Sequence, residues 1–489
     1  MAAQLHSGAP LGGPPPLQED APTVAIAGGG LAGLAAAARL LELGARPVVY
    51  EKRPFLGGRA FSFVDRETGV EVDNGQHVFL GVCSQYIAFL KLIDAWDRVH
   101  LASGLDIPVL SRGKLSRLKT WPLPGSLGML PVLLRYAHLG WRDKARVAYG
   151  MLKIRGARRE PGGGVLDNMT LDKWMRWHSQ NDRTIANFWN LIVLPSLNDD
   201  ISEVSADVGL MLFQTALLGE PSDAAIGYSR VGLTSLAGDS AQRWIEGRGG
   251  DVQAGVEVAA VEVDGAQITG LRTASGGVAA GDAYVLALPF YEVEALLPPE
   301  LAAAAPFSLA ASLEPAPIVG VHIWYDRQVL DEDFVAVLDS PIQWLFNASS
   351  LHAEAEKGQH VVVSLSGAWE WRDSPKSKLR EVFVPEMARL FPRAAAAGIT
   401  RFIVVKQLAA TFRSKPGAAR FRPSQLTPVP NLFLAGDWTQ TGWPSTMESA
   451  VRSGNLAAEA VAAHLGLAAG RASAPPNGLA NAPEEKKGQ

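Results

Sequence analysis

Apolar and polar positions are most sharply ordered between residues 23 and 50. Residues 23–27 (Thr-Val-Ala-Ile-Ala) form a short apolar run, which is typical of a buried parallel strand. A glycine-rich turn leads into residues 31–43, whose Ala and Leu content predicts a helix, and residues 47–50 form a second apolar strand. Strand, turn, helix and strand in this order predict a Rossmann-like βαβ unit at the start of an α/β protein.

Strand patterns and helix patterns both recur in the rest of the chain. Strand patterns that extend the first domain lie at residues 60–64, 70–72, 256–263, 266–272, 283–288 and 431–434. Residues 171–218 are helical in pattern, and Trp174, Trp177 and Trp189 are expected to lie in the core or to line a pocket. A second, antiparallel sheet is predicted from the apolar runs at residues 317–325, 335–338, 343–347 and 360–366. We therefore expect an inserted α+β domain.

Three glycines occupy the turn after the first strand. Gly28, Gly30 and Gly33 have the spacing G-x-G-x-x-G, which allows a tight turn, the approach of a pyrophosphate to the backbone, and close packing of helix on strand. The positive end of the following helix would face the phosphates. Glu51 ends the second strand eighteen residues after Gly33, where an acid binds a free ribose hydroxyl. This order of features predicts a dinucleotide-binding site.

Two further segments resemble motifs of the flavin-dependent amine oxidase and phytoene desaturase superfamily. Leu56-Gly57-Gly58-Arg59 is similar to its second fingerprint, in which Gly58 and Arg59 would lie against FAD. Residues 431–437 are similar to its final motif, an apolar strand ending in Gly436 and Asp437, whose carboxylate would reach ribityl or pyrophosphate hydroxyls. The resemblance extends over about residues 22–466 and implies FAD as the cofactor instead of NAD.

The resemblance also implies how the cofactor domain is assembled. The backbone of Val256 would touch the adenine, and the helix that begins at Met447 and runs to about residue 465 would direct its positive end toward the flavin. The expected FAD-binding domain comprises residues 21–100, 225–300 and 425–467, and the substrate and membrane-contact domain comprises residues 101–224 and 301–424. Residues 1–20 and 468–489 are expected to be disordered tails.

A polar segment, residues 73–77 (Asp-Asn-Gly-Gln-His), interrupts the apolar strands. By itself it is consistent with a turn. Together with residues 78–81 (Val-Phe-Leu-Gly) it resembles the signature of hydroxysqualene dehydroxylases, the squalene-associated flavin enzymes of bacterial hopanoid synthesis. That resemblance implies FAD-dependent reductive dehydroxylation of an isoprenoid lipid, hydroxysqualene, to squalene. Asp73 and His77 are the candidate acids for the departing hydroxyl, whereas His322 is expected to be a hydrogen-bonded structural residue.

Three other functions stay open. A carotenoid (phytoene)-type desaturase would use the same fold but oxidise its lipid substrate, and an amine oxidase would need an aromatic cage for a polar substrate. A non-catalytic isoprenoid-binding protein of this fold would not need intact flavin motifs at residues 58–59 and 436–437. No second dinucleotide fingerprint occurs in the sequence, so a reductase of this kind would need an external electron donor. No metal site is predicted.

Residues 112–159 mix basic and apolar side chains. They contain twelve Lys or Arg and one acid, Asp143, although the net charge of the whole chain is only −4. Trp121, Trp141, Tyr149 and several Leu are interleaved at helical spacing, a pattern typical of an interfacial segment that lies on anionic lipid. The alternative is a solvated basic face over a helical core. The overall charge gives no indication of nucleic-acid binding.

The cellular location is predicted from two further features. Cys83 is the only cysteine, which excludes an internal disulfide and fits a reducing compartment. Residues 1–20 lack the apolar core of a secretory signal. Together with the basic segment, these features predict a cytoplasmic protein that is peripheral on the inner face of the membrane.

Overall fold

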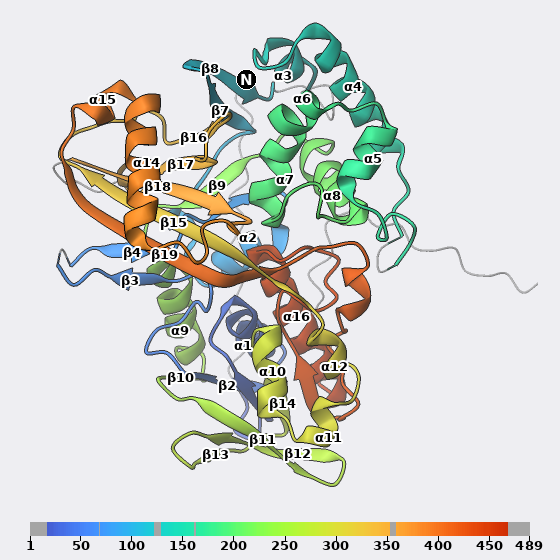
Figure 1. The fold of residues 1–489 in the computed structure, drawn as a ribbon. Helices are drawn as coiled ribbons and strands as arrows, with labels where there is room; N and C mark the ends of the chain where they lie inside the picture. Colours follow the sequence, from blue (N-terminus) through green and yellow to red (C-terminus); the bar gives the residue numbers. More distant parts are fainter. Residues whose placement is uncertain (1–16, 68, 122–128, 161–162, 353–357, 468–489) are drawn as a thin grey trace, which may run out of the picture.

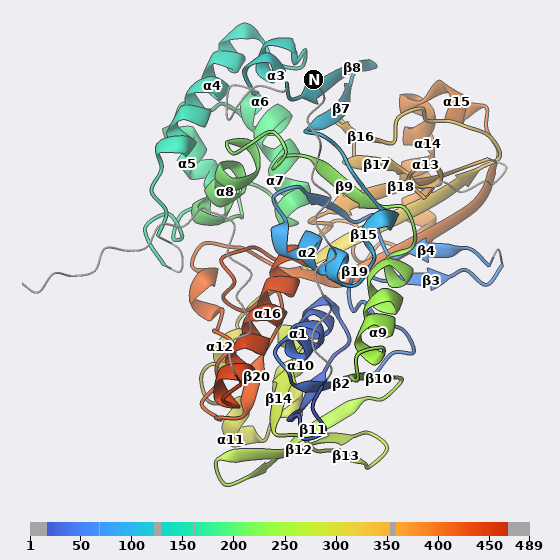
Figure 2. The same cartoon turned by 180° about the vertical axis from the view of Figure 1, so that it is seen from behind.

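The computed structural model describes residues 17–67, 69–121, 129–160, 163–352 and 358–467. Figure 1 shows an α/β unit at the bottom of the molecule, with a β-rich lobe and a helical lobe side by side above it. Figure 2 shows from behind that α1 (Leu31–Glu42) and α16 (Met447–His464) lie next to each other near the centre. Most of the two predicted tails lies outside the described residues.

A five-stranded parallel sheet forms the lower unit. Its strands come from widely separated parts of the chain, in the order β10 (Asp251–Ala254), β2 (Arg46–Glu51), β1 (Thr23–Ala27), β14 (Ala283–Leu286) and β20 (Leu432–Leu434). Each pair is parallel. A Cβ on Gly454 of α16 would lie 2.2 Å from the carbonyl oxygen of Ala32, so a glycine is required for the two helices to pack this closely. The predicted Rossmann-like domain is confirmed.

A small antiparallel sheet covers this unit. It consists of β11 (Val258–Asp264), β12 (Gln267–Thr273) and β13 (Val278–Ala279). Asp264 pairs with Gln267, and Gly265 has φ +61°, so the predicted hairpin around Asp264-Gly265 is confirmed. The short helices α10 (Phe290–Val293), α11 (Pro299–Ala302) and α12 (Phe307–Ala310) follow β14 and lead into the second sheet.

The second sheet has seven strands. Their order is β19 (Ile399–Phe412), β15 (Pro315–Tyr325), β18 (Gln359–Ser366), β17 (Trp344–Asn347), β16 (Phe334–Val337), β7 (Asp106–Ser111) and β8 (Lys114–Lys119). The four predicted runs pair antiparallel with one another, as expected, and β7, which was not predicted, joins this sheet parallel to β16. The helices α13 (Ala348–Leu351), α14 (Lys376–Leu390) and α15 (Pro392–Ala395) belong to this lobe. Phe383 of α14 packs with Val321 and Ile323 of β15, so α14 covers one face of the sheet.

Short strands connect the second sheet to the lower unit. They are β3 (Ser62–Val64), β4 (Glu71–Asp73), β5 (Val78–Leu80), β6 (Val99–Leu101) and β9 (Ile226–Ser229). β3 pairs with β4, and β9 lies between β5 and β6. The helix α2 (Ser84–Leu92) packs on α16, and α9 (Asp239–Glu246) packs on α1 and β10. A π-helical turn at Thr234–Gly238 precedes α9.

The helical lobe carries the basic segment. Its helices are α3 (Met129–Arg135), α4 (Trp141–Gly156), α5 (Leu171–Trp177), α6 (Asp182–Thr184), α7 (Asn190–Leu197) and α8 (Ala206–Leu212). Two predictions are corrected here. Residues 114–119 form the strand β8 instead of a helical stretch, because Leu118 packs inward beside β7. Trp177 is 65% exposed and does not lie in the core. Within the described residues, no helix could span a membrane.

Candidate active site

The turn between β1 and α1 contains glycines with different roles. Gly28 has φ +108°, and a Cβ on it would lie 2.5 Å from the carbonyl oxygen of Ala287. A Cβ on Gly33 would lie only 2.0 Å from the carbonyl oxygen of Gly28. Both positions therefore require glycine for the fold itself.

Gly30 differs from the other two glycines. It has φ −78° and ψ 176°, which any residue can adopt, and its nearest neighbour for a Cβ is Gly58 Cα at 3.6 Å. The fold thus leaves room for a side chain here. α1 begins directly after Gly30 and has no side-chain cap, so its first amides face this open space. Such a space at a helix N-terminus fits a phosphate group.

Glu51 ends β2 beside this turn. Its Oε2 accepts a hydrogen bond from the Gly29 amide (2.8 Å), and its Oε1 accepts one from the Arg53 amide (2.9 Å). The amide of Val256 donates to the carbonyl oxygen of Glu51 (2.9 Å). The two residues predicted to bind the ribose and the adenine are therefore adjacent at the end of β2. Their contacts with the cofactor stay predictions.

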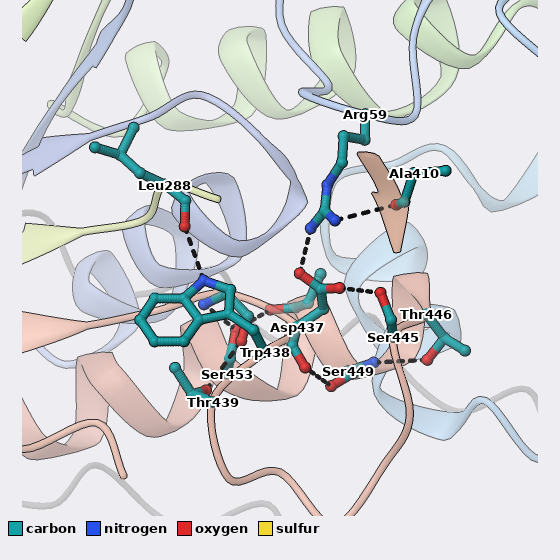
Figure 3. A network of polar contacts seen from close by, with 12 residues as sticks. Arg59, Leu288, Ala410, Asp437, Trp438, Thr439, Ser445, Thr446, Ser449 and Ser453 are labelled. Carbon is teal, nitrogen blue, oxygen red and sulfur yellow. Dashed lines mark hydrogen bonds and ion pairs between the residues drawn. The ribbon is translucent and has the colours of Figure 1, made fainter. Parts of the chain in front are cut away.

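The loop that contains Gly58 and Arg59 lies against the same turn. The amide of Gly57 donates to the carbonyl oxygen of Gly29 (2.9 Å), and Gly58 has φ +62°. The Arg59 guanidinium forms an ion pair with Asp437 and donates to the carbonyl oxygen of Ala410 (3.1 Å; Figure 3). Burial opposes the charged form of Arg59, but the attraction of Asp437 outweighs it and raises the pKa above its ordinary value.

Asp437 follows β20 and is the centre of a polar network (Figure 3). Besides Arg59, its carboxylate accepts a hydrogen bond from the Ser445 hydroxyl, and its carbonyl oxygen accepts one from Ser449 Oγ (2.9 Å). Thr446 caps α16 by accepting from the Ser449 amide, so Met447 is the first helical residue. The final motif and the N-terminus of α16 therefore lie together.

Several residues of this network were not predicted from the sequence. Arg422 is buried and donates to the carbonyl oxygens of Asp437 (3.0 Å) and Thr439 (2.6 Å). Burial lowers the pKa of Arg422 to about 10. Ser453 Oγ accepts a hydrogen bond from the Gly436 amide (2.8 Å). A lone Arg in a loop and a Ser within a helix carry no motif, so only the tertiary structure reveals them.

The predicted flavin residues therefore form one site. The N-termini of α1 and α16, the glycine turn, the Arg59 loop and Asp437 all lie at the carboxyl ends of β1, β2 and β20, where α/β sheets bind their ligands. The open space at Gly30 and the two helix N-termini suit a pyrophosphate, and Glu51 supplies an acid for a ribose. These residues fit FAD.

The segment 73–77 lies between this site and the second sheet. Asp73 Oδ1 accepts hydrogen bonds from Ser62 Oγ (2.6 Å) and the Leu233 amide (3.0 Å), and its Oδ2 lies 3.4 Å from His352 Nε2. Asp73 is 4% exposed. Asn74 Nδ2 donates to the carbonyl oxygen of Arg59 (2.8 Å), which ties the segment to the flavin loop.

The other candidate acid, His77, is held within the same segment. Its Nδ1 lies 2.8 Å from the carbonyl oxygen of Gly75, and burial lowers the pKa of His77 below its ordinary value. Among the described residues, no hydrogen bond or ion pair joins it to Asp73. The structure brings both candidates near the flavin loop, and their catalytic roles stay predictions.

A buried histidine pair lies on the sheet face opposite α14. His322 Nδ1 is 3.1 Å from His360 Nε2, and the Trp324 ring stacks on His360 at 3.9 Å between centroids. The predicted hydrogen bond of His322 is thus present. Burial lowers the pKa of His322 to about 4 and that of His360 well below its ordinary value, so both imidazoles are neutral near pH 7.

The depressed pKa of His322 predicts acid sensitivity. Between pH 6.5 and about 4 the unfolded chain binds a proton at residue 322 that the folded protein does not bind, so stability falls as the pH falls through this window. Replacement of His322 by Phe should reduce the slope of the unfolding free energy against pH in this window by up to about 1.4 kcal/mol per pH unit. Urea unfolding of both proteins at several pH values measures this difference, and identical slopes would contradict it.

Comparison with known proteins identifies relatives over nearly the whole chain. The family model of flavin containing amine oxidoreductases matches residues 31–462. A hydroxysqualene dehydroxylase of Rhodopseudomonas palustris is 29% identical over 461 residues, which cover 92% of this chain and 99% of that protein. A 15-cis-phytoene desaturase of Synechococcus elongatus is 28% identical over 461 residues, which cover 90% of this chain and 96% of that protein.

Solved structures show the same fold. Putrescine oxidase with bound putrescine has a TM-score of 0.70 at 16% identity, over 90% of this chain and 99% of that one. An oxidoreductase from Methanosarcina mazei has a TM-score of 0.68 at 18% identity, over 88% of this chain and 98% of that one. The chain belongs to the flavin containing amine oxidoreductase family, as a flavin-dependent oxidoreductase whose cofactor is FAD.

Proposed function

We propose that this flavoenzyme removes the hydroxyl group of hydroxysqualene reductively and forms squalene in bacterial hopanoid or squalene biosynthesis. The observation that carries the proposal is the segment 73–77, whose buried polar groups are hydrogen-bonded to the flavin loop through Asn74 and Arg59. Polar groups beside the flavin loop suit a substrate whose hydroxyl group leaves as water. The similarity to the dehydroxylase of Rhodopseudomonas palustris gives independent support.

The face of the second sheet away from α14 suits a hydrocarbon chain. The rings of Phe334, Trp344 and Phe346 form a cluster in which each pair of centroids is 6.1–6.2 Å apart. Phe346 also packs with Leu351 and Val362 in a small apolar cluster on the face of the sheet away from α14. An isoprenoid lipid would bury its apolar surface against such a wall.

The reaction needs one proton and one hydride for each hydroxyl group. Reduced FAD supplies the hydride when it is bound, and the hydroxyl oxygen takes a proton and leaves as water. Departure of an allylic hydroxyl leaves a delocalised cation on the lipid. The chain's own residues must position the lipid, exclude water from the cation and supply the proton. An external electron donor of unidentified nature would reduce the flavin.

The test is anaerobic incubation of the reduced holoprotein with hydroxysqualene, followed by lipid analysis. We expect squalene in a yield that matches the reduced flavin in a single turnover. Oxidised holoprotein is the control and should form none. Recovery of unchanged hydroxysqualene from the reduced holoprotein would refute the proposal.

A phytoene-type desaturase is the second candidate. The 28% identity to the desaturase of Synechococcus elongatus is nearly equal to that of the dehydroxylase, so identity does not decide between them. A desaturase would convert phytoene in the oxidised state and would leave reduced flavin behind. Bleaching of the flavin absorbance by phytoene would favour this alternative over the dehydroxylase.

We further propose that the enzyme works on an anionic membrane surface, from the cytoplasmic side. The outer face of α4 carries an apolar stripe, Trp141, Ala145, Tyr149 and Leu152, spaced for one side of a helix. Trp141 is 75% exposed and Leu152 is 69% exposed. Basic side chains accompany the stripe: Arg142 lies over Trp141 and Lys153 over Tyr149. Apolar rings flanked by cations match the interface of an anionic bilayer.

Removal of exposed charge beside this stripe should weaken vesicle binding. Replacement of Arg135, Arg142 and Lys153 by Gln should cost about 3 kcal/mol, or roughly a hundredfold in partitioning, because each cation near such a surface contributes about 1 kcal/mol. Flotation with phosphatidylserine-containing vesicles measures the effect. The matched control replaces Lys376, Lys378 and Arg380, which are exposed on α14. Equal binding of the two variants to the vesicles would refute the proposal that this face contacts the membrane.

A further inference from the structure

Several buried polar atoms near the flavin loop have no hydrogen-bond partner among the described residues. They are Asn74 Oδ1, both amide atoms of Gln76 and His322 Nε2. Asn74 is 3% exposed and His322 is 1% exposed. An unpaired buried polar atom is energetically unfavourable, so buried groups of this kind are normally paired. Such atoms gathered beside the candidate flavin site indicate a polar group of a ligand or an ordered water.

Gly320 shows where two of these residues meet. It lies two positions before His322 on β15, so both occupy the sheet face opposite α14. A Cβ on Gly320 would lie 3.4 Å from His322 Nε2 and 3.9 Å from the carbonyl oxygen of Asn74. The unpaired nitrogen of His322 and the backbone carbonyl oxygen of Asn74 therefore border the same space, which the missing side chain leaves open. We call this space the Gly320 pocket.

The Gly320 pocket lies beside the flavin loop. Asn74 borders the pocket and also donates its side-chain amide to the carbonyl oxygen of Arg59 (2.8 Å). The Arg59 guanidinium in turn contacts Ala410 of β19, the strand next to β15. A group in this pocket would thus be held between the second sheet and the loop that lies against FAD.

We propose that the Gly320 pocket binds the oxygen of an alcohol, the hydroxyl of a long isoprenoid substrate, through His322 Nε2 and Asn74. This inference deepens the proposed function and rests on it. A hydroxyl both donates and accepts, so it can pair with an unprotonated or a protonated imidazole nitrogen and with an amide oxygen. Gln76, two residues after Asn74, offers a further donor and acceptor from the same segment.

The Gly320 pocket would favour an alcohol over a hydrocarbon, because a bound hydrocarbon would leave the polar groups of the pocket unpaired. A hydrocarbon of the same skeleton cannot hydrogen-bond to His322 or Asn74, so its binding would leave both groups buried without a partner. Sites built for a hydroxyl reject the analogue that lacks it more strongly than apolar pockets reject an extra group. We expect the wild-type protein to bind the alcohol about tenfold to a hundredfold more tightly than the hydrocarbon.

Gly320→Ala is the decisive variant. Its new methyl group would be in ordinary van der Waals contact with His322 and Asn74, so the fold should accept it while the pocket is filled. Gly156→Ala is the matched control, because residue 156 is an exposed helix position with no neighbour within 4 Å of a Cβ. His322→Phe is the second variant, which removes the imidazole nitrogen but leaves Gly320 unchanged.

The experiment titrates oxidised holoprotein with hydroxysqualene and with squalene in detergent micelles and follows the perturbation of flavin absorbance. We expect Gly320→Ala and His322→Phe to lose the preference for the alcohol while squalene binding stays within about threefold, and Gly156→Ala to keep the preference. Equal affinity of the wild-type protein for both ligands would overturn the inference. The pocket would then bind only an ordered water. A retained preference in both variants, or equal weakening of both ligands, would overturn it too.

This measurement is independent of turnover. Oxidised flavin has no hydride to give, so binding is observed whether or not the protein is a dehydroxylase. If the reduced protein forms no squalene but Gly320→Ala still abolishes the alcohol preference, the proposed reaction fails and the oxygen-binding pocket stands. If squalene is formed but the preference is absent or insensitive to residue 320, the reaction stands and the pocket fails.

Discussion

Replacement of Gly30 by Val should yield a folded protein that cannot bind FAD. The backbone at Gly30 has ordinary dihedral angles, and its nearest neighbour for a Cβ is 3.6 Å away, so the chain itself tolerates a side chain. The branched side chain would instead occupy the space at the N-terminus of α1 that fits the pyrophosphate. Loss of two charge-assisted hydrogen bonds amounts to about 3–6 kcal/mol, or two to four orders of magnitude in Kd.

Flavin content and folding must be measured together. Absorbance of the purified variant gives its FAD content, and circular dichroism with thermal unfolding, compared with flavin-free wild type, reports its fold. Gly33→Val is the contrasting variant, because its side chain would overlap the carbonyl oxygen of Gly28 and should prevent folding rather than binding. Stoichiometric FAD in Gly30→Val would contradict the assignment of this turn.

The Rossmann-like unit could be predicted because its signals are local. Strand, glycine turn, helix and acid all fall within residues 23–51, so their spacing is visible in one short stretch of sequence. The strand β19 was missed although it spans fourteen residues, Ile399–Phe412. Its burial does not alternate, and Arg401 and Lys406 interrupt its apolar run with side chains that are only partly exposed. An edge strand with such contacts has no period-2 pattern to detect.

The flavin motifs could be predicted for the same reason, whereas the buried polar groups on the second sheet and around Asp437 could not. His322 and His360 are 38 residues apart and meet only because β15 and β18 pair in one register. Arg422 is likewise defined by its contact with the backbone of Asp437, which no local pattern indicates. The sequence prediction treated His322 as structural, and its unpaired nitrogen became apparent only in the folded chain.

Asp73→Asn and His77→Gln should retain FAD but slow squalene formation if either residue supplies the proton. Asp73 is buried, and an Asn side chain could keep the hydrogen bonds that Oδ1 accepts from Ser62 and Leu233 while losing the negative charge next to His352. His77→Gln keeps a polar side chain near Gly75 but removes a titratable group. A positioned acid contributes about a hundredfold or more to the rate, so single-turnover oxidation of the reduced flavin should slow by that factor.

The pattern across the two variants separates the roles of these residues. Slowing in Asp73→Asn alone would favour the carboxyl group or its partner His352 as the proton source, since they lie 3.4 Å apart. Loss of FAD in both variants would make the segment structural, because Asn74 in the same turn holds the carbonyl oxygen of Arg59. Full activity in both would exclude both residues. Asp199 would then be a poor substitute, since its carboxylate is held in an ion pair by Arg413, and an ordered water would have to deliver the proton.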